Sequence, residues 1–208
     1  MRESLVLMGK KKFIYKGFAY EKQTFLDDIN LSKTRYIIIL DEDIYVKRTS
    51  VNYKEISNDK IEKIKEESFG KDEEYLIDYN FNKKEDVLYI YAIKGGKVVS
   101  KLCNGANKIK VVPLQFYVMQ KLRKKIRDKI YVCGFKYMEK YYYYYFNNGF
   151  VEESYVFKDL EDMIKKINII ENKCVLYIEK GIDYRKFVYK IKIQELELRR
   201  ILNEKVFI

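Results

Sequence analysis

Two acidic runs and a pair of glycines are the residues whose types and spacing come closest to a chemical site. Carboxylates grouped as in Asp41-Glu42-Asp43 and Asp72-Glu73-Glu74 are the ligands that Mg²⁺ and Ca²⁺ prefer. Backbone amides at Gly95-Gly96, just before an expected helix, are placed to cradle a phosphate. The acidic runs fall between expected elements, where carboxylates are usually solvated, and the glycines match no phosphate-loop motif. We therefore expect turns at all three places, with no metal, no cofactor and no catalytic residue.

The residue types that are missing exclude several enzyme classes. The 208 residues include no His, so a Ser-His-Asp triad, a Cys-His dyad and a His-ligated metal are excluded within this chain. The cysteines, Cys103, Cys133 and Cys174, are widely spaced in apolar runs, which is typical of small buried side chains. No apolar run has the length of a membrane span or a signal peptide. We expect a cytoplasmic protein.

Positive charge is concentrated in one stretch of the chain. The formal net charge is +11, and residues 101–140, with eleven basic and two acidic side chains, carry +9 of it. The centre of this stretch is a basic patch made of Lys121, Arg123, Lys124, Lys125 and Arg127. Such a patch suits phosphates, anionic lipid heads or an acidic protein surface, or it is a solvated helix end. Only three Ala beside abundant Lys, Ile, Tyr and Asn also indicate a low-GC genome, which accounts for part of the excess.

Hydrophobic periodicity predicts a β-rich α/β protein in two parts. In residues 1–128 we expect strands first and then helices, with strands at 5–8, 12–16, 18–25, 36–40, 44–51, 75–81, 87–93 and 110–113. The helices are expected between a cap at Ser57, Asn58 or Asp59 and Gly70, after Gly96, and from 114 to near 128. In residues 129–208 we expect strands at 129–134, 141–146, 150–157 and 174–178, a helix at 160–167 and a last helix with Leu198, Ile201 and Leu202. Residues 188–193 are expected to form another strand or the approach to that last helix. The boundary between the two subdomains is expected close to residue 128.

The order of these elements resembles a known family over residues 36–182. A strand carrying Lys47-Arg48 is followed by a helix, by acidic residues, by the strand Tyr75-Leu76-Ile77-Asp78-Tyr79 and by a strand that ends in Ala92-Ile93-Lys94. Later come a hairpin around Asn148-Gly149 and a helix that begins near Leu160. This pattern resembles the actin-like PilM and GspL cytoplasmic-domain family of type IV pili and type II secretion. The resemblance implies a truncated actin-like, ribonuclease H-like fold of mixed sheets with helices packed on them.

The same resemblance implies a function. Actin-like ATPases bind phosphates with glycine hairpins that carry an Asp, whereas this chain has Val132-Cys133-Gly134 at the matching strand. The implied role is a non-enzymatic scaffold at the inner face of the cell membrane, with an assembly ATPase and the cytoplasmic tail of an inner-membrane protein as its partners. Two alternatives stay open at this point. One is a basic nucleic-acid-binding protein of phage or mobile-element type, and the other is a small actin-like ATPase.

Tyrosines on two neighbouring strands are the expected partner-binding residues. Tyr75 and Tyr79 are separated by an even number of residues, as are Tyr89 and Tyr91, so each pair shares one face of its strand. Asp78 interrupts the first of these strands and is expected at an edge or interface. Apolar anchors of this kind supply affinity, while the charge difference between residues 41–100 and 101–140 steers association. The alternative is that the tyrosines form core. For Tyr141 to Tyr145 we expect core together with one aromatic surface patch.

Overall fold

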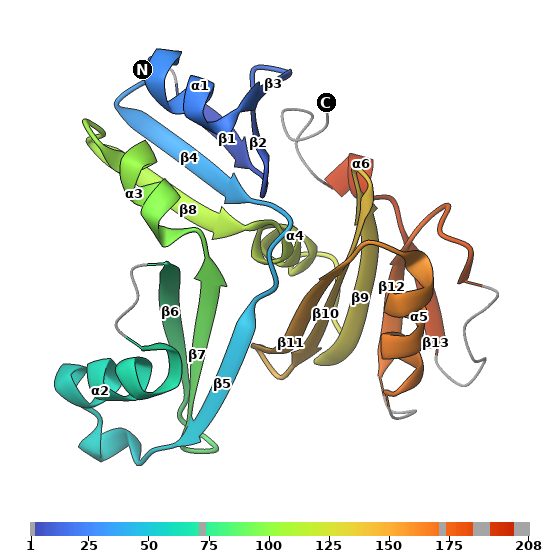
Figure 1. The fold of residues 1–208 in the computed structure, drawn as a ribbon. Coiled ribbons are helices and arrows are strands. Elements are labelled where there is room, and N and C mark those ends of the chain that lie inside the picture. Colours follow the sequence, from blue (N-terminus) through green and yellow to red (C-terminus); the bar gives the residue numbers. More distant parts are fainter. Residues whose placement is uncertain (1–2, 71–73, 171–173, 185–191, 202–208) are drawn as a thin grey trace. The chain divides into compact units, whose positions relative to one another are not determined.

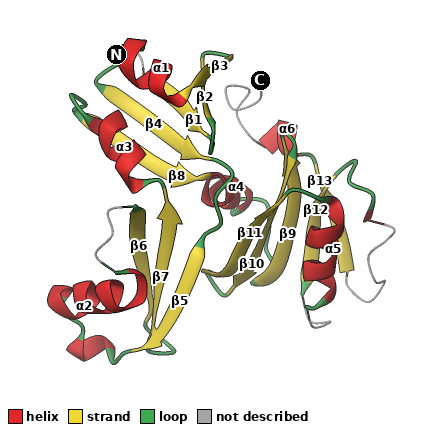
Figure 2. Cartoon of the chain, viewed as in Figure 1, coloured by secondary structure: helices red, strands yellow, loops and turns green. Residues whose placement is uncertain are grey.

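Figures 1 and 2 show the chain as a computed structural model. The structure describes residues 3–70, 74–170, 174–184 and 192–201. It divides into two compact units. The first unit consists of residues 1–42 and 105–208, and the second unit consists of residues 43–104. The division expected at residue 128 does not coincide with these units and stays a prediction.

The first sheet of the first unit has the strand order β3-β2-β1-β4-β8. Its strands are β1 Ser4–Met8, β2 Lys12–Tyr15, β3 Phe18–Glu21, β4 Thr34–Ile39 and β8 Lys108–Pro113. β1, β2 and β3 form an antiparallel meander, and β4 runs parallel to both β1 and β8. The expected strand over 18–25 is wrong in its second half, because α1 (Lys22–Asp28) begins after Glu21. The helix buries Phe25, whose ring centroid lies 4.8 Å from that of Phe13.

The second sheet of the first unit has the order β11-β10-β9-β12-β13. Its strands are β9 Ile130–Tyr137, β10 Lys140–Asn147, β11 Phe150–Phe157, β12 Val175–Glu179 and β13 Lys192–Leu196. The side chains of α5 (Leu160–Asn168) form a core with one face of this sheet, including Met163 against Tyr143. Tyr142 and Tyr144 lie on the opposite face and are buried as well. The central tyrosines of the run are therefore core on both faces, and only its ends are half-buried.

α4 (Leu114–Leu122) connects the two sheets of the first unit, since it contacts β4, β8 and β10. The expected continuation of this helix to residue 128 is wrong. The amides of Lys125 and Ile126 both donate to the carbonyl of Leu122, at 2.7 and 2.9 Å, and the chain then turns into β9. α6 (Leu198–Ile201) follows β13. The described part of the chain does not include residues 188–191 or Leu202, on which two of the predictions above rest in part.

The second unit is a three-stranded antiparallel sheet of order β5-β7-β6 with helices around it. Its elements are β5 Tyr45–Ser50, the 3-10 turn η1 Tyr53–Glu55, α2 Asn58–Phe69, β6 Tyr75–Asn82, β7 Val87–Lys94 and α3 Gly96–Cys103. The Ser57 side chain caps α2 by accepting from the Lys60 amide, and Gly70 ends it with a φ of 73°. Ile61 of α2 packs with Leu88 and Ile90, which fixes the helix on one face of this sheet.

Candidate functional site

Asp41 stands where the chain leaves β4, and its backbone has an unusual conformation. The β4 ladder continues one residue beyond the strand, since the Leu40 amide donates to the Met8 carbonyl at 2.8 Å. Asp41 then takes a φ of 60°, the left-handed region that Asp tolerates better than most residues. This kink ends the pairing with β1.

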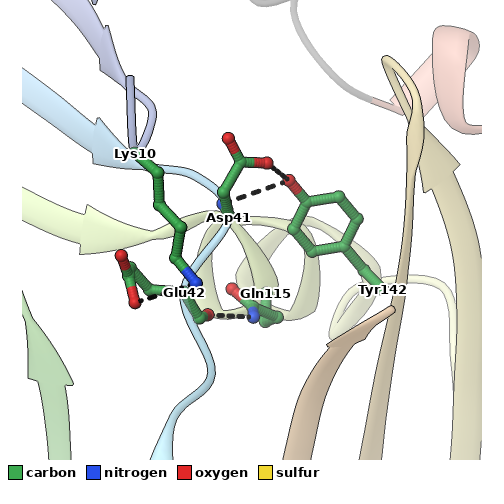
Figure 3. Close-up of polar contacts among 5 residues, drawn as sticks. All are labelled: Lys10, Asp41, Glu42, Gln115 and Tyr142. Carbon is green, nitrogen blue, oxygen red and sulfur yellow. Dashed lines mark hydrogen bonds and ion pairs between the residues drawn. The ribbon is translucent and has the colours of Figure 1, made fainter. Parts of the chain in front are cut away.

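The Asp41 carboxylate lies between two hairpins of the first unit (Figure 3). Oδ2 faces Gly9 in the β1–β2 turn, where a Cβ atom would come within 3.1 Å of it. Oδ1 accepts a hydrogen bond of 3.3 Å from the hydroxyl of Tyr142. Tyr142 lies near the start of β10, which is the second strand of the β9–β10 hairpin. The same hydroxyl accepts from the Asp41 amide at 3.3 Å. A single residue therefore ties the first sheet to the second.

Glu42 extends this cluster to α4 and to the β1–β2 turn (Figure 3). The side-chain amide of Gln115, which is only 1% exposed, donates to the Glu42 carbonyl at 3.0 Å. The Glu42 carboxylate pairs with Lys10 at 3.5 Å. Lys10 is well exposed, so this ion pair contributes about 0–1 kcal/mol. The buried amide contact is the stronger constraint, because losing it would leave a buried polar group without a partner.

The chemistry of the cluster is that of a structural connection. Burial, and then the neighbouring Asp41 carboxylate, raise the pKa of Tyr142 above its ordinary value of 10, so the hydroxyl stays protonated and donates at neutral pH. Acid–base catalysis at neutral pH needs a group that titrates near that pH, and Tyr142 does not. Across residues 3–70, 74–170, 174–184 and 192–201, no group of three or more Cys, Asp or Glu side chains is arranged to hold a metal ion. Through these contacts, residues 40–42 are held to β1, β10 and α4.

Neither hairpin carries the Asp-x-Gly pattern of a phosphate site. The β1–β2 turn has Gly9-Lys10-Lys11, and the β9–β10 turn has Met138-Glu139. The strand expected to end at Gly134 continues to Tyr137, so this glycine is inside β9. A Cβ atom at Gly134 would lie 3.4 Å from Sδ of Met163. Gly134 therefore gives α5 room to pack and has no place in a turn.

The other acidic and glycine runs fit the expectation of turns where the structure describes them. The amides of Gly95 and Gly96 both donate to the Glu74 carbonyl, each at 2.8 Å. Gly95 has a φ of 112°, which favours glycine. The two amides are thus bound to the protein backbone, and the tight turn is confirmed. Of the second acidic run, Asp72 and Glu73 lie outside the described part of the chain.

The five expected partner-binding residues lie on two faces of the sheet in the second unit. Tyr79 pairs with Ile90, so Tyr75 and Tyr79 share the face that α2 covers in part. Asp78 pairs with Tyr91, so Asp78, Tyr89 and Tyr91 share the other face. Tyr79 is 44% exposed, whereas Tyr89 is 1% and Tyr91 8% exposed. The alternation of side chains shows which residues of one strand share a face. Whether two strands present their tyrosines on the same face of the sheet depends on the register between them.

Tyr45 lies on the same face as Tyr75 and Tyr79, and sequence reasoning missed it. Tyr45 of β5 pairs with Ala92 of β7, and Ala92 in turn pairs with Ile77 of β6. Because Ala92 is small, the rings of Tyr45 and Tyr75 meet across it at a centroid distance of 5.9 Å. Tyr45 is 43% exposed, close to the value for Tyr79. No local signal marked Tyr45, because its position opposite Ala92 follows from the pairing of β5 with β7.

All five residues of the basic patch are exposed. The Arg123 guanidinium donates to the Gly149 carbonyl at 3.3 Å and lies 5.9 Å from the centre of the Phe146 ring, so Arg123 supports the β10–β11 turn. Nζ of Lys121 lies 5.5 Å from the centre of the Tyr117 ring. Lys124, Lys125 and Arg127 present their charge to solvent.

Comparison with known proteins identifies the fold. Three solved structures each match 98% of this chain. A Bacteroides thetaiotaomicron protein with an actin-like ATPase fold matches with a TM-score of 0.56, 13% identity and 93% of its length covered. The cytoplasmic domain of EpsL, an inner-membrane component of the type II secretion system of Vibrio cholerae, matches with a TM-score of 0.56, 8% identity and 92% covered. The PilM-PilN type IV pilus biogenesis complex matches with a TM-score of 0.50, 10% identity and 89% covered.

These likenesses confirm the expected actin-like α/β fold and the structural resemblance to EpsL and PilM. No protein-family model and no curated protein matches the sequence. Of the helices in the described ranges, none has the length and apolar character needed to cross a membrane.

Proposed function

We propose that this protein is a non-enzymatic, actin-like scaffold of a type IV pilus or type II secretion assembly platform. The observation that carries the proposal is the Asp41 bridge in an actin-like fold. The carboxylate lies against Gly9 of the first hairpin and accepts from Tyr142 of the second. In an actin-like ATPase such hairpins hold phosphates. Here the two hairpins are joined by a contact within the chain, through Asp41.

The charges at this place also disfavour a bound nucleotide. The Asp41 carboxylate near Gly9 already accepts a hydrogen bond from the Tyr142 hydroxyl at 3.3 Å, so it is engaged within the protein. Lys10, which would suit a phosphate, is already paired with Glu42 at 3.5 Å. We therefore propose that the fold is kept for docking and that no ATP is hydrolysed.

The proposed partners are an assembly ATPase and the cytoplasmic tail of an inner-membrane protein, at the inner face of the membrane. Support comes from the fold likeness to the EpsL cytoplasmic domain and to PilM in its complex with PilN. Tyr45 and Tyr79, both more than two-fifths exposed, are apolar anchors available to a peptide.

Two measurements test this proposal. In titration calorimetry with Mg-ATP we expect no heat of binding at micromolar protein, and a micromolar dissociation constant would revive the ATPase alternative. In co-purification with the tail of the membrane protein encoded beside it, we expect Tyr45→Ala with Tyr79→Ala to weaken capture by at least tenfold. The control is Tyr53→Ala, an equally exposed tyrosine outside the sheet. Equal capture of the unmodified protein, the double variant and the Tyr53→Ala control would refute this face as the docking site.

A further inference from the structure

The sheet of the second unit has two edge strands, and the direction of their backbone amides follows from the ladder. β7 lies between β5 and β6 (Figure 1), and within the described ranges β5 pairs with no other strand. The Val51 amide donates to the carbonyl of Asp86, just before β7, at 2.8 Å. Amide directions alternate along a strand, so the amides of Val46, Arg48 and Ser50 point away from the sheet.

The outward amides of β6 are satisfied by side chains of the same strand. β7 bonds its two neighbours with alternate residues, and Tyr91 is left for β6, where it pairs with Asp78. The amides of Tyr79 and Phe81 therefore point away from the sheet. They donate to the side-chain oxygens of Asp78 and Asn80, each at 2.9 Å. These contacts occupy the donors that another strand would need, so the β6 edge is closed.

The β5 edge lacks such contacts on both sides of its centre. Among the residues that the structure describes, no hydrogen bond reaches the outward amides of Val46 and Ser50. Ser50 is exposed and Val46 is half-buried. An edge with unused donors and acceptors is a template for one more strand, which an extended segment of another protein can supply. β5 is therefore the edge of this sheet that is open to strand addition.

The side chains in the middle of β5 determine which charge the added strand can carry. Lys47 and Arg48 are both exposed and, as neighbours in a strand, lie on opposite faces. The Arg48 guanidinium lies 5.5 Å from the centre of the Tyr89 ring, which holds it over its face of the sheet. Acidic side chains opposite the two cations stabilise a pairing, and basic ones destabilise it. A second copy paired antiparallel about the middle of β5 would place one cation opposite its own counterpart, so self-pairing is disfavoured.

We propose that the β5 edge binds an extended acidic segment of a partner protein, which adds a fourth strand to this sheet. Backbone hydrogen bonds to the outward groups of β5 supply affinity. Two adjacent acidic residues opposite Lys47 and Arg48 fix the register. The inference goes beyond the proposed function, because it concerns one strand edge and holds whichever assembly the chain belongs to. Failure of either proposal therefore leaves the other standing.

The test is titration calorimetry of the full chain with the acetylated and amidated peptide Thr-Val-Glu-Glu-Val-Thr. Two matched peptides serve as controls. The first has Lys-Lys in place of Glu-Glu, which reverses the charge. The second keeps Glu-Glu but carries N-methyl groups on its four central amides, which removes the donors that strand pairing needs and leaves the side-chain charge unchanged. We expect the unmodified acidic peptide to bind about tenfold more tightly than either control.

Changes in the chain test the position of the contact. Lys47→Glu with Arg48→Glu should reverse the preference, so that the Lys-Lys peptide binds better than the Glu-Glu peptide. The control, Lys84→Glu with Lys101→Glu, makes the same change of net charge at exposed sites outside β5 and should keep the preference for Glu-Glu. Ser50→Pro removes an outward donor that the ladder with β7 does not use, and should weaken binding of the acidic peptide severalfold.

Three outcomes would overturn the proposal. Equal binding of the acidic peptide and its N-methylated form would mean that charge alone attracts them. An equal change of preference in variant and control would mean that the cations of β5 have no special place. Absence of binding to all three peptides would mean that Lys47 and Arg48 only keep this edge from pairing. The peptide series uses the unmodified chain, so it decides the proposal even if a variant does not fold.

Discussion

Asp41 and Tyr142 are 101 residues apart in the sequence, yet each donates a hydrogen bond to the other. The Tyr142 hydroxyl donates to the carboxylate, and the Asp41 amide donates to that hydroxyl, each at 3.3 Å. One residue comes from the segment that leads out of the first sheet, and the other from the second sheet. The pair therefore makes the geometry of the first unit depend on a polar contact, in addition to the apolar packing of α4.

Replacing Tyr142 by Phe should destabilise the protein, whereas the same change at Tyr143 should not. Tyr142→Phe leaves the Asp41 amide and carboxylate without this partner, at a cost of about 1 kcal/mol. Within the described ranges, the buried hydroxyl of Tyr143 has no hydrogen-bond partner, so its removal relieves a desolvation cost. Urea denaturation followed by circular dichroism measures both. A Tyr143→Phe loss as large as that of Tyr142→Phe would contradict the assignment.

Gly9→Ala should be more costly than Gly134→Ala. A Cβ atom at Gly9 would lie 3.1 Å from both the Asp41 carboxylate and the Lys12 carbonyl, and the latter is backbone that moves little. We expect a cost of about 1–3 kcal/mol, in the range of overpacked sites. At Gly134 the nearest atom is Sδ of Met163 at 3.4 Å, an ordinary contact with a flexible side chain, so the cost should stay below about 1 kcal/mol. The denaturation midpoints of the two variants decide this, and equal midpoints would argue against the crowding at Gly9.

Local signals predicted most elements of the fold, and tertiary contacts decided the exceptions. The Ser57 cap and Gly70 delimit α2 as expected, and Asn148-Gly149 makes the expected hairpin. The predicted strand over 18–25 fails from residue 22 on, where α1 begins and buries Phe25 against Phe13. A stripe of apolar residues through Ile126 predicted too long a helix, since Ile126 is buried from a turn and not from a helix.

The candidate site depended on information that a single sequence lacks. Asp41 stood out as part of an acidic run, but its partner Tyr142 is one of five adjacent tyrosines, and nothing local distinguishes it. The faces of Tyr79 and Tyr89 depend on the β6–β7 register, in which Tyr79 pairs with Ile90. A one-residue change of register would place the two rings on the same face.

Tyr79→Ala and Tyr89→Ala should therefore separate binding from folding. Tyr79 is 44% exposed, so its truncation should change the free energy of unfolding by less than about 1 kcal/mol. Tyr89 is 1% exposed, and the cavity left by its ring should cost about 3–5 kcal/mol. Thermal denaturation gives both values. A large loss of stability in Tyr79→Ala would remove it as a test of partner binding.

Alkaline pH should unfold this protein through its buried tyrosines. Burial is the main cause that raises the pKa of Tyr131, Tyr142, Tyr143 and Tyr144 above the ordinary value of 10. Below pH 10 these hydroxyls are protonated in both the folded and the unfolded chain, so they contribute their full stability. Above pH 10 the unfolded chain loses protons that the folded chain keeps, so the free energy of unfolding falls as pH rises. Each such tyrosine lowers it by about 1.4 kcal/mol per pH unit.

The measurement is a pH titration that follows tyrosinate absorbance at 295 nm and far-ultraviolet circular dichroism on the same sample. Because the buried hydroxyls ionise only when the chain opens, we expect a steep rise in absorbance that coincides with the loss of secondary structure above pH 10. Tyr143→Phe removes one of these groups, and the dependence of stability on pH should become shallower by about 1.4 kcal/mol per pH unit. If all tyrosines ionise in one reversible step while the circular dichroism is retained, the tyrosine core of the second sheet is not as tightly buried as the structure has it.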